Sequence, residues 1–165
     1  LRDVYKRQIN DVIEYLNASY ALRNSDFLEK VKEYHLTSEQ MQKGATLPYD
    51  FVTLVGMNDL QCGRPLAVVP STETPKFDEY KIVGSKIYSG VPDFTVHYRK
   101  RLEEVESVND EIDLPIIFES LVRNFAFAAL SNSNEEMLSG IEEAVQNIVP
   151  MRRYSHAKIR MPFMV

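Results

Sequence analysis

The strongest constraint on the fold is an abrupt change of pattern in the middle of the chain. Residues 45–100 hold five of the eight prolines and are rich in β-branched and aromatic residues, which break helices and favour strands. On both sides of this region, apolar residues recur at three- and four-residue steps, the spacing of amphipathic helices. This order predicts an α+β fold with a β module between two helical regions.

The region before the β module is predicted to be helical. Apolar positions over residues 9–20 share one helical face, and a second stripe over residues 27–34 follows a break at Asn24. Thr37–Gln40 has the spacing of a capping box, so we expect a short third helical turn that ends at Gly44.

The first eight residues, 1–8, share no apolar period with the helix predicted from Ile9 and resemble translated sequencing-adapter DNA. We therefore expect them to be a non-native leader and exclude them from the fold prediction. Residues 9–150 are predicted to form a single α+β domain, with residues 45–100 inserted between its helices. Residues 151–165 are expected to form an extended C-terminal tail.

The β module is predicted to be an antiparallel meander of four or five short strands. Residues 51–55 and 66–69 are β-rich runs, and residues 80–88 form a hairpin around a two-residue Gly-Ser turn. Over residues 94–98, apolar and polar side chains alternate, which predicts a strand with one buried face.

The C-terminal half is predicted to hold an acidic surface connection and a helical hairpin. Six acids lie within residues 101–113, and a strong apolar stripe over residues 114–130 predicts a long helix. Ser133 and Glu136 have capping-box spacing at the start of a second helix, which Pro150 ends.

Composition and motifs argue against an enzyme. A single cysteine, Cys62, excludes an internal disulfide and a cysteine zinc cage, and no dinucleotide, phosphate-loop or Gly-x-Ser-x-Gly motif is present. A dyad of Cys62 with His97 is conceivable. Asn109–Asp113 resembles a calcium loop but lacks its central glycine and distal glutamate. We therefore expect no catalytic residues, metal or cofactor, and no apolar run is long enough to span a membrane.

Charge is unevenly distributed along the chain. Residues 101–149 carry −9 and residues 150–165 carry +4, within a total of −5. One candidate acidic surface, or channel wall, lies on the last helix and consists of Glu135, Glu136, Glu142 and Glu143; an ordinary solvent face is the alternative.

The basic tail also contains apolar residues at alternate positions, as a strand with one buried face would. We expect it to dock as an edge strand on an adjacent subunit, and packing on the chain's own core is the alternative. The candidate docking residues are Arg152, Arg153, Tyr154, Lys158, Ile159, Arg160, Met161, Phe163 and Val165.

Four stretches occur in a characteristic order: GATLPYDFV (44–52), EYKIVGSKIY (79–88), FTVHYRK (94–100) and DLPIIFESLV (113–122). In this order and spacing, the chain resembles the head–tail connector proteins (adaptor or tail-tubular proteins) of tailed bacteriophages over about residues 9–149.

The resemblance implies a virion structural protein that is assembled in the host cytoplasm. In this family the subunits commonly form a twelve-membered ring beneath the portal, beside neighbouring tail proteins and around the passing double-stranded DNA. An excess of carboxylates would let DNA slide through such a channel. A monomeric binding or regulatory module is the alternative, and a small hydrolase that uses Cys62 and a histidine is a more distant one.

Overall fold

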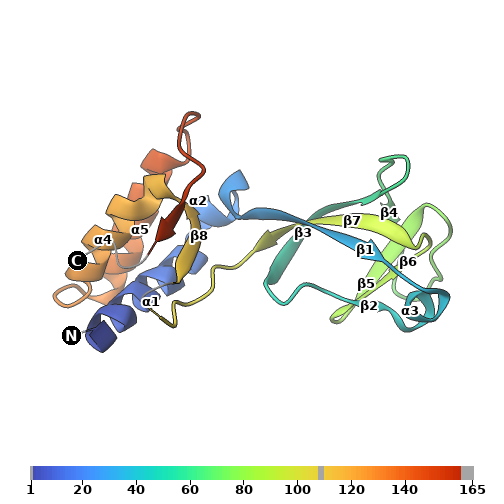
Figure 1. Cartoon of the computed structure of the whole chain (residues 1–165), viewed down its shortest axis with the longest axis horizontal. Coiled ribbons are helices and arrows are strands. Elements are labelled where there is room, and N and C mark those ends of the chain that lie inside the picture. Colours follow the sequence, from blue (N-terminus) through green and yellow to red (C-terminus); the bar gives the residue numbers. More distant parts are fainter. Residues whose placement is uncertain (1, 108–109, 161–165) are drawn as a thin grey trace. The chain divides into compact units, whose positions relative to one another are not determined.

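The computed structural model describes residues 2–107 and 110–160, with side chains from Tyr5 onward. These residues form two compact units (Figure 1): a helical unit of residues 2–28, 101–107 and 110–160, and a β unit of residues 29–100. Each unit has its own hydrophobic core. The sequence predicted one α+β domain over residues 9–150, whereas the structure has two packing units, and the insertion begins at Glu29 rather than at residue 45.

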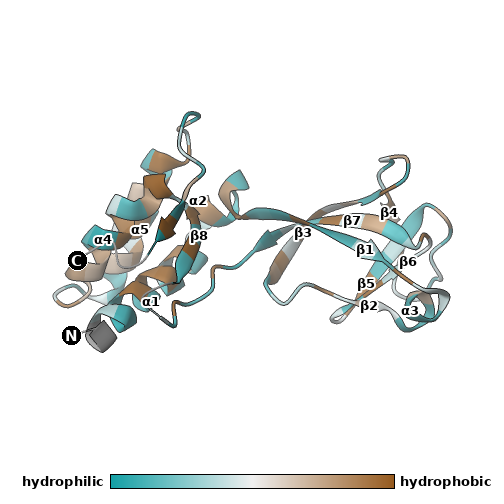
Figure 2. Ribbon diagram, in the orientation of Figure 1, coloured by the Kyte–Doolittle hydropathy of each residue, from teal (hydrophilic) through white to brown (hydrophobic). Residues whose placement is uncertain are grey.

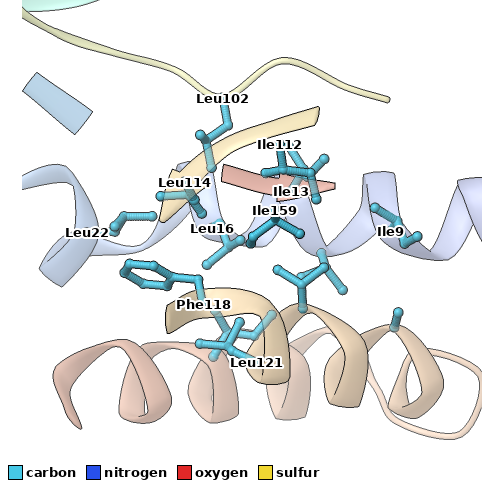
Figure 3. Close-up of a cluster of buried hydrophobic side chains, with 14 of the residues drawn as sticks. Ile9, Ile13, Leu16, Leu22, Leu102, Ile112, Leu114, Phe118, Leu121 and Ile159 are labelled. Carbon is cyan, nitrogen blue, oxygen red and sulfur yellow. The ribbon is translucent and has the colours of Figure 1, made fainter. Parts of the chain in front are cut away.

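The helical unit combines helices with one small sheet. Its elements are α1 (Arg2–Ala18), α2 (Tyr20–Arg23), the 3-10 turn η1 (Asp26–Leu28), β8 (Glu111–Pro115), the 3-10 turn η2 (Ile116–Phe118), α4 (Glu119–Ala128), α5 (Asn134–Ile148) and β9 (Lys158–Arg160). Strands β8 and β9 pair antiparallel. The core collects side chains from α1, β8, β9 and α4 around Leu16 and Phe118, as Figure 3 shows.

The first residues of the chain belong to α1. The helix already includes Arg2, and Tyr5 lies one turn before Ile9 on the same helical face. The Tyr5 ring packs edge-to-face on Phe127 with centroids 5.8 Å apart, and Gln8 is buried. The prediction that residues 1–8 share no pattern with the helix is therefore wrong, because Tyr5 supplies the missing apolar position.

A second helix over residues 27–34 is also not present. Phe27 and Leu28 end the first part of the helical unit, and Glu29–His35 form the edge strand β1, which pairs with β7 over seven residues. Figure 2 shows β1 as hydrophilic along most of its length. The helical spacing of Val31 and Tyr34 was misleading because only Tyr34 is buried; backbone pairing with β7 decides the conformation.

The long helix predicted from residue 114 begins later. Glu111–Pro115 form β8, from which Ile112 and Leu114 enter the core on alternate positions, and α4 starts at Glu119. The start of α5 is as predicted, because the Ser133 side chain accepts a hydrogen bond from the Glu136 N–H at 3.3 Å. Gly140 lets α5 approach α4 closely, since a Cβ there would lie 2.8 Å from the Phe125 ring.

The β unit contains two sheets. Its elements are β1 (Glu29–His35), α3 (Ser38–Lys43), β2 (Ala45–Thr46), β3 (Phe51–Asp59), β4 (Ala67–Val68), β5 (Glu79–Val83), β6 (Lys86–Ser89) and β7 (Asp93–Lys100). One sheet has the order β1-β7-β3 and the other β2-β6-β5-β4. Its core collects the buried side chains of β7 (Phe94, Val96 and Tyr98) with Met57 and Ile87.

In the β unit, the predicted caps, turns and strand alternation are confirmed, whereas the predicted strand topology is not. The capping box of Thr37 and Gln40 is complete, Gly84 makes the hairpin turn with a φ of 59°, and β7 alternates between buried and half-buried side chains. The single antiparallel meander is wrong, because β7 pairs with β1 and β3 and because β4 runs parallel to β5. The coarser prediction of an α+β fold is confirmed.

Candidate interaction surfaces

The end of the described C-terminal tail is part of the helical unit's own sheet. In β9, Ile159 lies opposite Ile112 and Arg160 opposite Glu111, and the Ile116 N–H donates to the Ala157 carbonyl at 2.8 Å. Ile159 is fully buried in the core. For residues 158–160 the docking on an adjacent subunit is therefore wrong, because β8 of the same chain offers the pairing edge.

The basic charges of β9 are also neutralised within the chain. Lys158 Nζ lies 2.7 Å from Asp113 Oδ1, and Arg160 Nε lies 3.0 Å from Glu111 Oε1. These pairs are largely solvent-exposed, so each contributes at most about 1 kcal/mol. The two ion pairs show which carboxylates the basic residues of β9 contact: they are acids of the same chain rather than acids of another subunit.

The segment before β9 is held by a row of rings. Tyr154 packs on Phe27 and on His156, with ring centroids 5.1 Å and 5.0 Å apart. The neighbouring Arg152 and Arg153 are exposed. The remaining candidate docking residues, Met161, Phe163 and Val165, lie outside the described residues.

The four glutamates of α5 do not form one acidic surface. Glu135 and Glu136 are exposed in the first turn of α5, where they complement the helix dipole, and Glu143 is exposed in the second half of the helix. Glu142 instead accepts hydrogen bonds from Ser19 Oγ at 2.6 Å and from the Ala21 N–H at 2.9 Å. It therefore connects the start of α2 to α5.

The ionisation of Glu142 is explained by these contacts. Burial alone would raise the pKa of its carboxyl, but the hydrogen bonds from Ser19, Ala21, Gln146 and Tyr20 together hold the pKa below its ordinary value. A carboxylate that accepts several hydrogen bonds is stabilised in its charged form.

The acidic connection is not a simple surface loop. Two residues of the segment 101–107, which we call the strap, are buried: Leu102 and Val105. Between and after them, Glu103, Glu104 and Glu106 are exposed. Together with neighbouring acids and α1, the strap lines a groove of about 750 Å³ whose acidic residues are Glu14, Glu103, Glu104, Glu106, Asp110 and Glu111.

Asp110 closes the turn at the end of the strap. Its carboxylate accepts hydrogen bonds from the N–H groups of Glu106 and Ser107 at 2.7 Å and 2.9 Å, and these bonds lower its pKa. Asn109, the first residue of the calcium-loop alternative, lies outside the described residues. Among the residues that are described, no group of three His, Cys, Asp or Glu side chains is arranged to hold a metal ion.

Cys62 and the histidines each have different neighbours. Cys62 Sγ donates to Asp59 Oδ2 at 3.4 Å in the turn after β3, and His97 is half-buried beside Thr95 on β7. His35 Nδ1 lies 2.8 Å from Asp93 Oδ1, and hydrogen bonds to Asp93 and Glu33 raise its pKa. The absence of catalysis stays a prediction.

A buried polar cluster in the β unit was not foreseen from the sequence. Asp50, only 3% exposed, accepts a hydrogen bond from the Tyr98 hydroxyl at 2.8 Å and one from Lys30 Nζ at 3.3 Å. Burial, and after it the bond to Asp50, raises the pKa of Tyr98. In the sequence, this cluster is indicated only by an aspartate, Asp50, directly before a β-rich run.

No protein-family model matches this sequence, and no curated protein matches it either. No helix in the described part of the chain is long and apolar enough to cross a membrane.

Proposed function

We propose that this chain is a non-enzymatic structural subunit of a tailed-bacteriophage virion, a head–tail connector that forms a ring below the portal around the DNA channel. The proposal rests on the agreement between the four resembling stretches and the boundaries of the elements. LPYDF leads into β3, which begins at Phe51. The second stretch is the β5–β6 hairpin, the third lies within β7, and the fourth leads through β8 and η2 into α4.

The surface chemistry of the helical unit is compatible with this role. The strap displays Glu103, Glu104 and Glu106 to solvent, and the groove beside it is lined mainly by carboxylates. A surface that faces moving DNA should repel phosphates rather than bind them. Of the basic residues of β9, Arg160 pairs with Glu111 and so offsets one carboxylate of the groove, whereas Lys158 pairs with Asp113 outside it.

The pairing of the tail within its own chain limits which surfaces can join subunits. Residues 158–160 pair with β8 of the same chain, so a ring would need contacts from other surfaces. Exposed apolar side chains occur on both units, including Val68 and Phe77 on the β unit and Leu130 on the helical unit. Contacts between different surfaces of identical subunits generate closed rings when the rotation closes.

Native mass spectrometry over a wide range of protein concentrations, with negative-stain imaging of the same samples, tests the proposal. A connector subunit is expected to give one closed ring, and the family resemblance implies twelve members. A chain that remains monomeric at every concentration contradicts self-assembly and favours the monomeric binding module. No specific observation favours the hydrolase, since the hydrogen-bond partner of Cys62 is Asp59.

A further inference from the structure

Strand β1 is a long and regular edge of its sheet. The strand order β1-β7-β3 leaves the second side of β1 unpaired among the described residues. Its register with β7 runs over seven residues, Glu29–His35, without a shift, and all of its side chains except that of Tyr34 are exposed. Such an edge presents a row of backbone N–H and C=O groups to any second extended strand.

The hydrogen bonds to β7 decide which backbone groups of β1 point outward. The Leu36 N–H donates to the Pro92 carbonyl at 2.9 Å, one step beyond the pairing of His35 with Asp93. Hydrogen-bonded and non-hydrogen-bonded pairs alternate in an antiparallel ladder, so the even-numbered residues of β1 direct their backbone groups to β7. The odd-numbered residues direct theirs away from the sheet, and a second strand would bond to these residues.

A second copy of β1 that pairs antiparallel with this edge meets like charges in each extended register, because odd-numbered residues must lie opposite odd-numbered ones. In the register with the longest overlap, Glu29 lies opposite His35 of the second copy, and Lys32 lies opposite Lys32. A shift by two residues in one direction places Glu33 opposite Glu33, and the opposite shift places Lys30 opposite Lys32. Like charges directly opposite each other destabilise a strand pair.

We propose that the charge order of β1 prevents this edge from pairing with β1 of a second copy, and that Lys32 blocks the longest pairing. In that register Lys32 forms the one like-charge pair, since Lys30 lies opposite Tyr34 and Glu29 opposite His35. Pairing of β1 with itself would join two copies across a twofold axis, which is not the head-to-tail contact that closes a ring. The inference holds whether or not the subunits form a ring.

Substitution of Lys32 tests the proposal. Lys32→Thr removes the like-charge pair and introduces a residue that favours strands, whereas Lys32→Arg keeps the charge and is the matched control. Lys43→Thr removes the same charge from α3, outside the edge strand. Analytical ultracentrifugation should show a dissociation constant for pairing of two copies that is at least about fivefold lower in Lys32→Thr than in either control. Equal dissociation constants in Lys32→Thr and Lys32→Arg overturn the proposal.

Hydrogen exchange resolved to single amides identifies the contact itself. In Lys32→Thr, the outward amides of Val31 and Glu33 should become protected as the protein concentration rises, because they bond to the second copy. In Lys32→Arg, both amides should exchange as fast as in the unsubstituted chain. Unchanged exchange at both amides in Lys32→Thr, or equal protection in the two variants, contradicts the proposal. A ring that forms through other surfaces leaves these two amides unaffected, so the readout is independent of ring assembly.

Discussion

Asn17 on α1 holds the backbone of Leu102 through two hydrogen bonds, one in each direction. Its Oδ1 accepts from the Leu102 N–H at 2.7 Å, and its Nδ2 donates to the Leu102 carbonyl at 3.0 Å. Asn10, two helical turns earlier, binds Val105 in the same way, at 2.7 Å and 3.0 Å. An asparagine amide carries both a donor and an acceptor. The two side chains therefore supply the strap with the backbone hydrogen bonds that a neighbouring strand would otherwise supply.

Replacing Asn17 by alanine should destabilise the helical unit by about 1–3 kcal/mol, because the backbone groups of the buried Leu102 lose both partners. Urea unfolding monitored by circular dichroism measures the loss. Asn24→Ala is a suitable control, since Asn24 is exposed and its side chain bonds to Tyr20 of its own helical turn. An equal, small effect of both substitutions would show that the strap is not held by Asn17.

Glu142 should make stability depend on pH in the acid range. Its pKa is lowered in the folded chain, so its contribution is complete above its ordinary pKa of about 4.5 and is lost as the pH falls through the folded value. Glu142→Gln should cost about 1 kcal/mol at pH 7 and reduce the loss of stability below pH 4.5. Thermal unfolding at several pH values, with Glu143→Gln as the exposed control, checks this. An unchanged acid slope in Glu142→Gln would contradict it.

Ile159→Ala should cost about 2–4 kcal/mol, since the side chain is fully buried in the helical unit's core and its truncation leaves a cavity. Lys158→Ala removes only an exposed ion pair and should cost less than about 1 kcal/mol. Chemical denaturation of both variants measures the difference. A fully stable Ile159→Ala variant would instead favour docking of the tail between subunits.

Tyr98→Phe should destabilise the β unit by about 1–3 kcal/mol, because it removes one hydrogen-bond donor from the buried carboxylate of Asp50. Hydrogen exchange resolved by peptide should show the loss in β3 and β7. Tyr20→Phe is the control, since Tyr20 is strongly exposed and belongs to the helical unit. A comparable loss in both variants would show that the contact with Asp50 has no special role.

Only part of the candidate interaction surfaces could be predicted from the sequence. The tail's alternation correctly indicated a strand with Ile159 on the buried face, but alternation carries no information about which chain supplies the partner strand. The four glutamates of α5 look equivalent at seven-residue spacing, and only the approach of α2 distinguishes Glu142. Asn10 and Asn17 also lie seven residues apart, yet their role depends on the strap that crosses them.

Helix caps, turns and strand alternation could be predicted from the sequence itself. Side-chain capping at Thr37 and Ser133, the turn at Gly84 and the alternation of β7 depend on residues within a few positions of one another. Short-range sterics and hydrogen bonds determine such features, so the sequence alone specified them, together with the α+β class.

Only the tertiary structure decided the features that need distant partners. Residues 29–34 and 114–115 belong to stretches with helical spacing but become parts of strands. The reason is that β7 and β9 supply backbone hydrogen bonds and that burial of Leu114, together with Ile112 of the same strand, favours the extended form. Propensity differences are small, at about 1 kcal/mol or less per residue. Pairing and burial that involve residues from 43 to 70 positions away therefore outweigh them.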